Sequence, residues 1–231
     1  MEGELMNPII EKCMLTDEQR SLILKGIKQG KEEYRMVSPL IRNTITKKHS
    51  PFLLSDLVNT HVAKLIEDNP HTQMKVFTKR AGFHPYIVIQ DKIRNIFILV
   101  SKLRKDRYIF NLSEYRGDFA ISNGDRLFEM GMPLEEIYGD TSYQYTLPLG
   151  MENQPFGIIV CYDSKNDVVY EGALTPDQED WIYKEEITEY INIDTETLVP
   201  LNNHQLSDIQ TPLKPPIEDE IVVRLKSKIS S

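Results

Sequence analysis

A short polar stretch between two apolar runs carries the residue types that metal-dependent hydrolysis requires. Gln90, Asp91 and Lys92 begin the stretch that separates "YIVI" from "IFILV". A nuclease that uses a bound metal needs an acidic ligand, a second oxygen ligand at a strand end and a lysine that stabilises charge. Asp68 and Gln90 would be the metal ligands, with Lys92 as the lysine and Glu67 in support. The pattern defines one candidate function: a Mg²⁺-dependent nuclease with Asp68, Gln90 and Lys92 as catalytic residues.

The same stretch is also typical of a β-hairpin turn. Both flanking runs are rich in β-branched residues, and five polar-to-mixed residues, 91–95, separate them. Aspartate is favoured in turns because its carboxylate accepts hydrogen bonds from nearby backbone N–H groups. Lys92 would then lie in a loop instead of continuing a strand. We favour the turn, and we expect Asp68 and Gln90 to lie too far apart to share a metal ion.

Two helices are predicted before this hairpin. Residues 16–34 begin with Thr16 as a cap and acids in the first turn, although Gly26 and Gly30 weaken the pattern. Residues 50–69 begin with Ser50 and Pro51, and apolar residues follow at spacings of three and four. His61 falls on that apolar stripe, where a histidine is usually a core residue.

The remaining pattern predicts further strands. A second hairpin turn is expected at 163–167, and strands are expected at 108–112 and 143–149. Residues 113–140 fit one short helix, whereas 175–191 fit either a helix or a loop that leads into a strand. The sequence therefore predicts an α+β fold, with N-terminal helices packed on a mainly antiparallel sheet that contains two β-hairpins.

The domain organisation follows from composition. Residues 1–199 are expected to form a single α+β domain, helical over 1–70 and sheet-rich over 74–199. Residues 200–216 contain four prolines and few apolar residues, which is typical of a linker. Residues 217–231 are expected to be a C-terminal docking segment, either a helix or a short strand.

Charge is distributed unevenly along the chain. Residues 1–108 hold 19 Lys and Arg against 12 Asp and Glu, a net charge of +7, and the rest hold 8 against 23, so that the whole chain carries −8. Such asymmetry is a hint of nucleic-acid contact by the basic part, and internal neutralisation between the halves is the more ordinary explanation. The candidate nucleic-acid-binding residues form a helical stripe and a basic turn: Lys25, Lys28, Lys31, Arg35, Lys102, Arg104, Lys105 and Arg107.

The acidic half indicates a second kind of partner. Acids surround two aromatic residues near position 180, and such a surface could bind a basic protein. The candidate partner-binding residues are Asp177, Glu179, Asp180, Trp181 and Tyr183.

Several functions are disfavoured by what the sequence lacks. Nucleotide-binding glycine motifs, zinc-protease and serine-hydrolase motifs and Cys-x-x-Cys pairs are absent, and the five histidines do not cluster. The start lacks a basic signal peptide, and no apolar run could span a membrane. We expect a cytoplasmic protein without a cofactor, apart from Mg²⁺ in the nuclease interpretation. Whether it is an enzyme, and its oligomeric state, stay open.

One resemblance adds a setting. The stretches "GIIVCYDSKNDVVYEGALTPDQEDWIYKEEI" and "HPYIVIQDKIRNIFILV" resemble uncharacterised proteins of low-GC Gram-positive bacteria and their phages or mobile elements. The resemblance implies a bacterial or phage setting, in which roles in phage defence, counter-defence or a toxin system are common, and it implies no reaction. Our leading hypothesis is a macromolecule-binding protein whose basic half contacts nucleic acid. The nuclease and a module that binds a basic protein partner are the alternatives.

Overall fold

A computed structural model describes residues 6–41, 50–81, 84–103, 108–138 and 154–192. The chain divides into two compact units, 1–194 and 195–231, and every described element belongs to the first. Its centre is a six-stranded sheet in the order β1-β2-β3-β4-β5-β6. The strands are β1 (Met74–Ala81), β2 (His84–Asp91), β3 (Ile96–Lys102), β4 (Phe156–Tyr162), β5 (Val169–Leu174) and β6 (Trp181–Glu186).

The sheet consists of two antiparallel meanders joined side by side. Strands β1 to β3 form the first meander and β4 to β6 the second, and β3 pairs with β4 in parallel. This parallel pair requires a long crossover connection, because parallel neighbours cannot be joined by a hairpin. Helices α4 (Glu114–Glu129) and α5 (Leu134–Tyr138) lie in that connection. The predicted α+β class and the mainly antiparallel sheet are confirmed.

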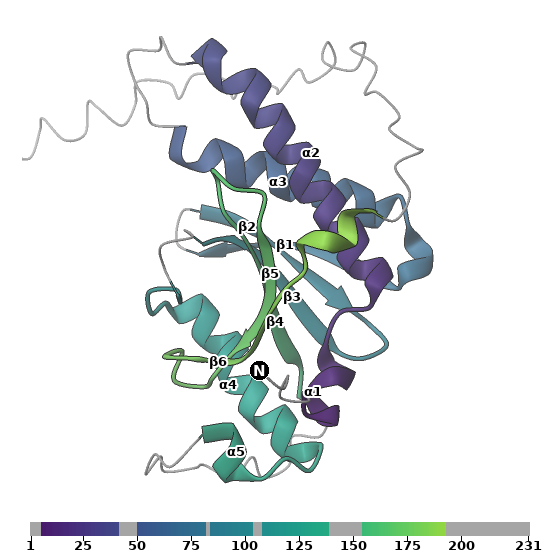
Figure 1. The fold of residues 1–231 in the computed structure, drawn as a ribbon, viewed down its shortest axis with the longest axis vertical. Coiled ribbons are helices and arrows are strands. Elements are labelled where there is room, and N and C mark those ends of the chain that lie inside the picture. The colour runs from purple at the N-terminus through teal and green to yellow at the C-terminus, as the bar shows by residue number, and fades with distance from the viewer. Residues whose placement is uncertain (1–5, 42–49, 82–83, 104–107, 139–153, 193–231) are drawn as a thin grey trace, which may run out of the picture. The chain divides into compact units, whose positions relative to one another are not determined.

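One face of the sheet is covered by the N-terminal helices (Figure 1). These are α1 (Pro8–Cys13), α2 (Asp17–Ile41) and α3 (Ser50–Glu67). Two 3-10 turns are also present: η1 (Pro70–Thr72) precedes β1, and η2 (Thr188–Asn192) follows β6. Gly26 and Gly30, which weakened the helix prediction, are where α2 meets α3. A Cβ atom at Gly30 would lie 2.5 Å from the Cα of Val58, and one at Gly26 would lie 2.7 Å from that of Val62. The two glycines therefore permit an unusually close helix pair.

Helix α4 packs against the opposite face, over β4 and β5. The close approach depends on Gly157, since a Cβ there would lie 2.7 Å from the Cβ of Phe119. Asn123, which is 1% exposed, fixes the helix. Its side-chain nitrogen donates to the carbonyls of Gly157 and Leu174, both at 3.1 Å, and its oxygen accepts from the Gly157 N–H.

Helix α2 is tied to the second meander by buried charges. Arg20 donates through Nε to Glu171 Oε2 at 2.7 Å and through Nη2 to Glu185 Oε2 at 2.8 Å. Glu171 is fully buried, and it also accepts from the Tyr183 hydroxyl and the Leu15 N–H. Burial and the Glu171 carboxylate raise the pKa of Tyr183, so that the phenol remains a donor. A fully satisfied network of this kind fixes one arrangement of helix and sheet.

Local predictions met different outcomes. The turns at 91–95 and 163–167 are confirmed, because β2 ends at Asp91, β3 begins at Ile96, and β4 and β5 flank the second turn. The strand predicted at 108–112 is wrong: those residues are irregular, and Phe110 packs against the Trp181 ring. Residues 175–191 adopt the loop-and-strand alternative as β6. The strand predicted at 143–149, the linker 200–216 and the segment 217–231 lie outside the described residues.

The other expectations concern single elements. His61 is 8% exposed and its Nε2 contacts the Glu33 carboxylate, as a core histidine would. Cys13 and Cys161 are buried, and burial raises the pKa of each thiol. No helix of the described residues is both long enough and apolar enough to cross a membrane.

Candidate functional site

The Gln90-Asp91-Lys92 stretch is organised around the Asp91 carboxylate. Its Oδ1 accepts from the backbone N–H groups of Ile93 and Arg94, at 2.9 and 3.1 Å. Its Oδ2 accepts from Gln19 Nε2 at 2.9 Å and Arg94 Nε at 2.8 Å. Arg94 also donates to the Met14 carbonyl and to Gln19 Oε1. Asp91 therefore caps its own turn and anchors that turn to the start of α2.

The ionisation of Asp91 reflects this arrangement. The carboxylate is 3% exposed, and burial alone would raise its pKa. Hydrogen bonds from Gln19 and from the backbone and side chain of Arg94, together with the charge of Arg94, outweigh burial and lower the pKa. Asp91 is thus a structural anion with all its acceptor sites engaged.

The candidate nuclease residues do not converge. Ile89 and Asp91 face the N-terminal helices, so Gln90, which alternates with them on β2, projects from the opposite face. Asp68 directly follows α3, which packs on the helix-covered face, and its side chain is exposed. Lys92 is exposed in the turn, where its N–H donates to the Gln73 carbonyl. No cluster of three His, Cys, Asp or Glu suited to a metal ion occurs within the part of the chain that the structure describes.

The basic stripe predicted on α2 is divided between internal pairing and exposure. Lys31 is 4% exposed, and its Nζ contacts the Asn166 carbonyl and Asp167 Oδ1, the latter at 2.8 Å. Arg35 contacts the same carboxylate at 3.2 Å, and hydrogen bonding to Lys31 is the main reason that the pKa of Asp167 is lowered. Lys28 is exposed, and Lys25 is half-buried. Lys31 and Arg35 thus hold the second hairpin turn.

Of the other predicted basic residues, Lys102 lies within the described part of the chain, at the C-terminal end of β3. Lys102 is exposed, and it shares the helix-covered side of β3 with Ile98 and Val100. Arg104, Lys105 and Arg107 lie outside the described residues.

The acidic candidates mostly organise a loop. Asp177 Oδ1 accepts from Thr175 Oγ1 and the Glu179 N–H, and Asp180 Oδ1 accepts from the Trp181 N–H and the Tyr108 hydroxyl. Glu179 is exposed. The two aromatic candidates are core residues: Trp181 is 9% and Tyr183 6% exposed. The structure therefore separates the aromatic residues from the acidic surface that the sequence suggested.

A different set of residues forms a second candidate surface, on the first meander. The registers of β1, β2 and β3 place nine side chains on the face away from α2 and α3. We call this the basic-aromatic face. Its rows are Lys75–Gln90–Phe97, Phe77–Val88–Leu99 and Lys79–Tyr86, and Ser101 lies on the same side of β3, two residues beyond Leu99. Among the described helices, α4 lies over β4 and β5, and Tyr115 of α4 meets Tyr86, with ring centroids 5.2 Å apart. The middle of the face is covered, since Val88 is 0% and Leu99 2% exposed, and Leu99 belongs to the second apolar cluster.

The composition of this face is one-sided. Its two charged members are both lysines, Lys75 and Lys79, and both are exposed. Phe77, Tyr86 and Phe97 are half-buried, whereas Val88 and Leu99 of the middle row are buried. Lys75 Nζ lies 4.7 Å from the centroid of the Phe77 ring. The face thus offers cations and ring surfaces with no carboxylate among its nine side chains.

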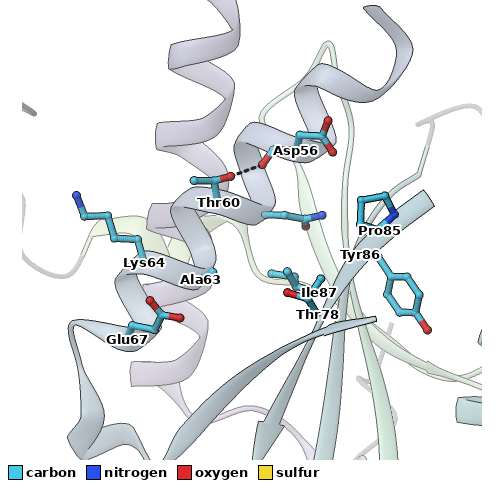
Figure 2. A pocket seen from close by; sticks show the side chains of 10 residues that line it. Asp56, Thr60, Ala63, Lys64, Glu67, Thr78, Pro85, Tyr86 and Ile87 are labelled. Carbon is cyan, nitrogen blue, oxygen red and sulfur yellow. Dashed lines mark hydrogen bonds between the residues drawn. The ribbon is translucent and has the colours of Figure 1, made fainter. Parts of the chain in front are cut away.

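A groove of about 420 Å³ runs on the other side of the first hairpin, between α3 and strands β1 and β2. Figure 2 shows side chains of α3 along one wall and of the hairpin along the other. The helix contributes Asp56, Thr60, Ala63, Lys64 and Glu67, and the hairpin contributes Thr78, Pro85, Tyr86 and Ile87. Its lining mixes both charge signs with hydroxyl groups.

Comparison with known proteins gives no assignment: no family model matches the chain, and neither the curated proteins nor the solved structures contain a match.

Sequence reasoning missed the basic-aromatic face, although a signal was present. Lys75, Phe77 and Lys79 alternate in "KVFTK", which is the period-two pattern of one strand face. The pairing registers, which unite this pattern with Tyr86 and Phe97, cannot be obtained from the pattern of a single strand.

Proposed function

We propose that the protein binds single-stranded nucleic acid through the basic-aromatic face. The observation that carries this proposal is the placement of Lys75 and Lys79 beside the partly exposed rings of Phe77, Tyr86 and Phe97. Nucleic acid presents both chemistries at once, since phosphates attract lysines and bases stack on aromatic rings.

The spacing of the groups supports this pairing. Lys75 and Lys79 lie four residues apart on β1, which is about 13 Å along a strand. Phe77 and Tyr86 are diagonal neighbours on adjacent strands, a relation that brings residues within about 7–8 Å. Successive unstacked bases can therefore meet successive rings while the backbone passes the lysines at the edge.

Gln90 adds a recognition group between Lys75 and Phe97. Its side-chain amide offers both donors and an acceptor, which suits the edges of unpaired bases. In this proposal Gln90 contacts the ligand as a hydrogen-bonding group, with no metal involved.

The preference for single strands follows from the surface itself. Half-buried aromatic side chains around the buried centre of the face can stack with splayed bases, whereas a duplex keeps its bases stacked inside and offers mainly phosphates. The expectation that the basic half contacts nucleic acid is kept, but the residues differ, because Lys31 and Arg35 are engaged with Asp167.

Fluorescence anisotropy with labelled single-stranded RNA, single-stranded DNA and duplex DNA, titrated from low to moderate salt, tests the proposal. Replacing both Lys75 and Lys79 with alanine should reduce the slope of log affinity against log salt by about 1.4, or 0.7 for each phosphate contact. Phe77→Leu should weaken single-strand binding by about 1–3 kcal/mol and leave the salt slope unchanged.

Lys28→Ala is the matched control, because Lys28 is an exposed lysine on α2, remote in sequence from the face. It should bind like the unaltered protein. Undetectable binding of every oligonucleotide at low salt, or an equal loss in Lys28→Ala, would overturn the proposal.

A further inference from the structure

Strand β1 is an edge strand with an unpaired outer side. It is eight residues long and pairs only with β2, and no other strand of the described residues lies against it. Within it, Thr78, Lys79 and Arg80 are exposed. Unpaired backbone N–H and C=O groups along an accessible edge form a template for another extended chain.

The pairing pattern identifies which backbone groups face outward. The Lys92 N–H donates to the Gln73 carbonyl, directly beyond the pair Met74–Asp91, so Gln73 and Lys92 form a hydrogen-bonded pair. Such pairs alternate along an antiparallel ladder with pairs whose groups point away from the partner. The N–H and C=O groups of Met74, Val76, Thr78 and Arg80 therefore point to the open edge.

The groove of Figure 2 lies beside this edge. Thr78, one of the outward-directed residues, is also part of the groove wall and faces Thr60, Ala63 and Lys64 of α3. A chain added to β1 would project alternate side chains toward α3, where the groove of about 420 Å³ could receive them. Backbone pairing and side-chain space thus occur together.

Charge selects the kind of chain. Strand β1 carries three cations, Lys75, Lys79 and Arg80, and no acid. A second copy of the protein pairing through the same strand would bring six cations together, and the antiparallel register centred on Phe77 would place Lys75 opposite Lys79. Like charges directly opposite one another are destabilising, whereas opposite charges stabilise a strand pair. Self-pairing is disfavoured, and an acidic strand is favoured.

We propose that β1 binds an extended acidic peptide by strand addition, with its backbone hydrogen-bonded to Val76, Thr78 and Arg80 and alternate side chains in the groove beside α3. The peptide supplies carboxylates opposite the cations of β1, and its backbone supplies affinity that does not depend on sequence. This inference does not require nucleic-acid binding: Lys75 and Lys79 serve in both proposals, but the edge backbone and the groove serve only the peptide.

The probe is an acetylated eight-residue peptide of alternating glutamate and valine, matched to the length of β1. Titration into isotopically labelled full-length protein, followed by amide NMR, should give saturable shifts at Thr78 and Arg80. The same N–H groups should become protected from solvent exchange, whereas Phe77 and Lys79 are already protected by β2. A peptide with N-methyl groups at alternate residues should not bind. A peptide with lysine in place of glutamate should bind at least about tenfold more weakly than the glutamate peptide.

A variant separates this site from the basic-aromatic face. Thr78→Pro removes only an outward N–H, and proline is tolerated where a strand's N–H faces solvent. It should abolish peptide binding while the salt-dependent affinity for oligonucleotides is retained. If the unmethylated and N-methylated peptides bind the unaltered protein equally, or the glutamate peptide does not bind at millimolar concentration, strand addition is excluded whatever the nucleic-acid result.

Discussion

At the scale of single residues, Asp91 makes acid stability measurable. Its pKa is lowered in the folded protein relative to about 3.9 in an unfolded chain. The stabilisation is therefore complete above about pH 4 and is lost as the pH falls through the folded value. Asp91→Asn should lower the free energy of unfolding at pH 7, and the difference from the unaltered protein should shrink below pH 4. Urea denaturation at a series of pH values measures this difference, and a constant difference down to pH 2.5 would contradict it.

Glu171 is the residue whose replacement should be most damaging among the buried charges described. Glu171→Gln leaves the Arg20 guanidinium, 5% exposed, without its closest counter-charge. Breaking a buried pair from one side costs about 3–5 kcal/mol, since the remaining charge stays buried. Glu185→Gln is the matched control, because it faces the same arginine but its side chain is 34% exposed. It should cost about 1 kcal/mol or less. If chemical denaturation shows that both variants lose the same free energy of unfolding, burial of the carboxylate does not determine the cost.

At the scale of elements, the α2–α3 contact depends on Gly30. Alanine usually stabilises a helix relative to glycine by about 1 kcal/mol. Here the added Cβ would meet the backbone of Val58 at 2.5–2.7 Å, so Gly30→Ala should destabilise the protein by about 1–3 kcal/mol. Gly117→Ala in α4 is the control, because its Cβ would meet only the end of the Gln178 side chain, at 3.0 Å. Thermal unfolding of both variants should separate them, and an unchanged or raised midpoint in Gly30→Ala would refute the tight contact.

Elements with strong local signals were predictable. Both hairpin turns carry an aspartate that accepts from the backbone two and three residues later, Asp91 in the first and Asp163 in the second, and a local bond of this kind is encoded locally. The 108–112 segment has strand-like residues but is irregular in the structure. It is held by a tertiary contact, in which Trp181 Nε1 donates to the Tyr108 carbonyl. That contact joins residues 73 positions apart, and no local pattern reports it.

The candidate site was predictable only in its broad location. The excess of positive charge in the first half points to the region, but it does not distinguish Lys31, which Asp167 neutralises, from Lys75, which stays exposed. Both lysines have helix- or strand-forming residues beside them in the sequence, so their local sequence does not tell them apart. What separates them is tertiary burial, and this depends on where the second meander packs against α2.

At the scale of the whole molecule, the buried core of the described residues ends at Ile187. All its members lie within the compact unit 1–194. A fragment of residues 1–194 should therefore unfold in a single cooperative transition, with a midpoint within a few degrees of that of the full chain. Circular dichroism during heating measures this. The control is the full chain, heated under the same conditions. Loss of the cooperative transition in the fragment would show that later residues are needed for folding.

The joining of two meanders through a parallel pair has a consequence during synthesis. Strand β3 ends at Lys102 and β4 begins at Phe156, so the ribosome must translate roughly fifty further residues before β3 gains its inner neighbour. At ordinary elongation rates this interval lasts roughly 3–10 s. During this interval the edge of β3 that later pairs with β4 is unpaired. Arg20 and Lys31 also lack their partners Glu171 and Asp167, which have not yet been translated. We therefore expect an interval during synthesis in which β3 lacks one neighbouring strand, and slowing translation between codons 103 and 155 should lengthen it.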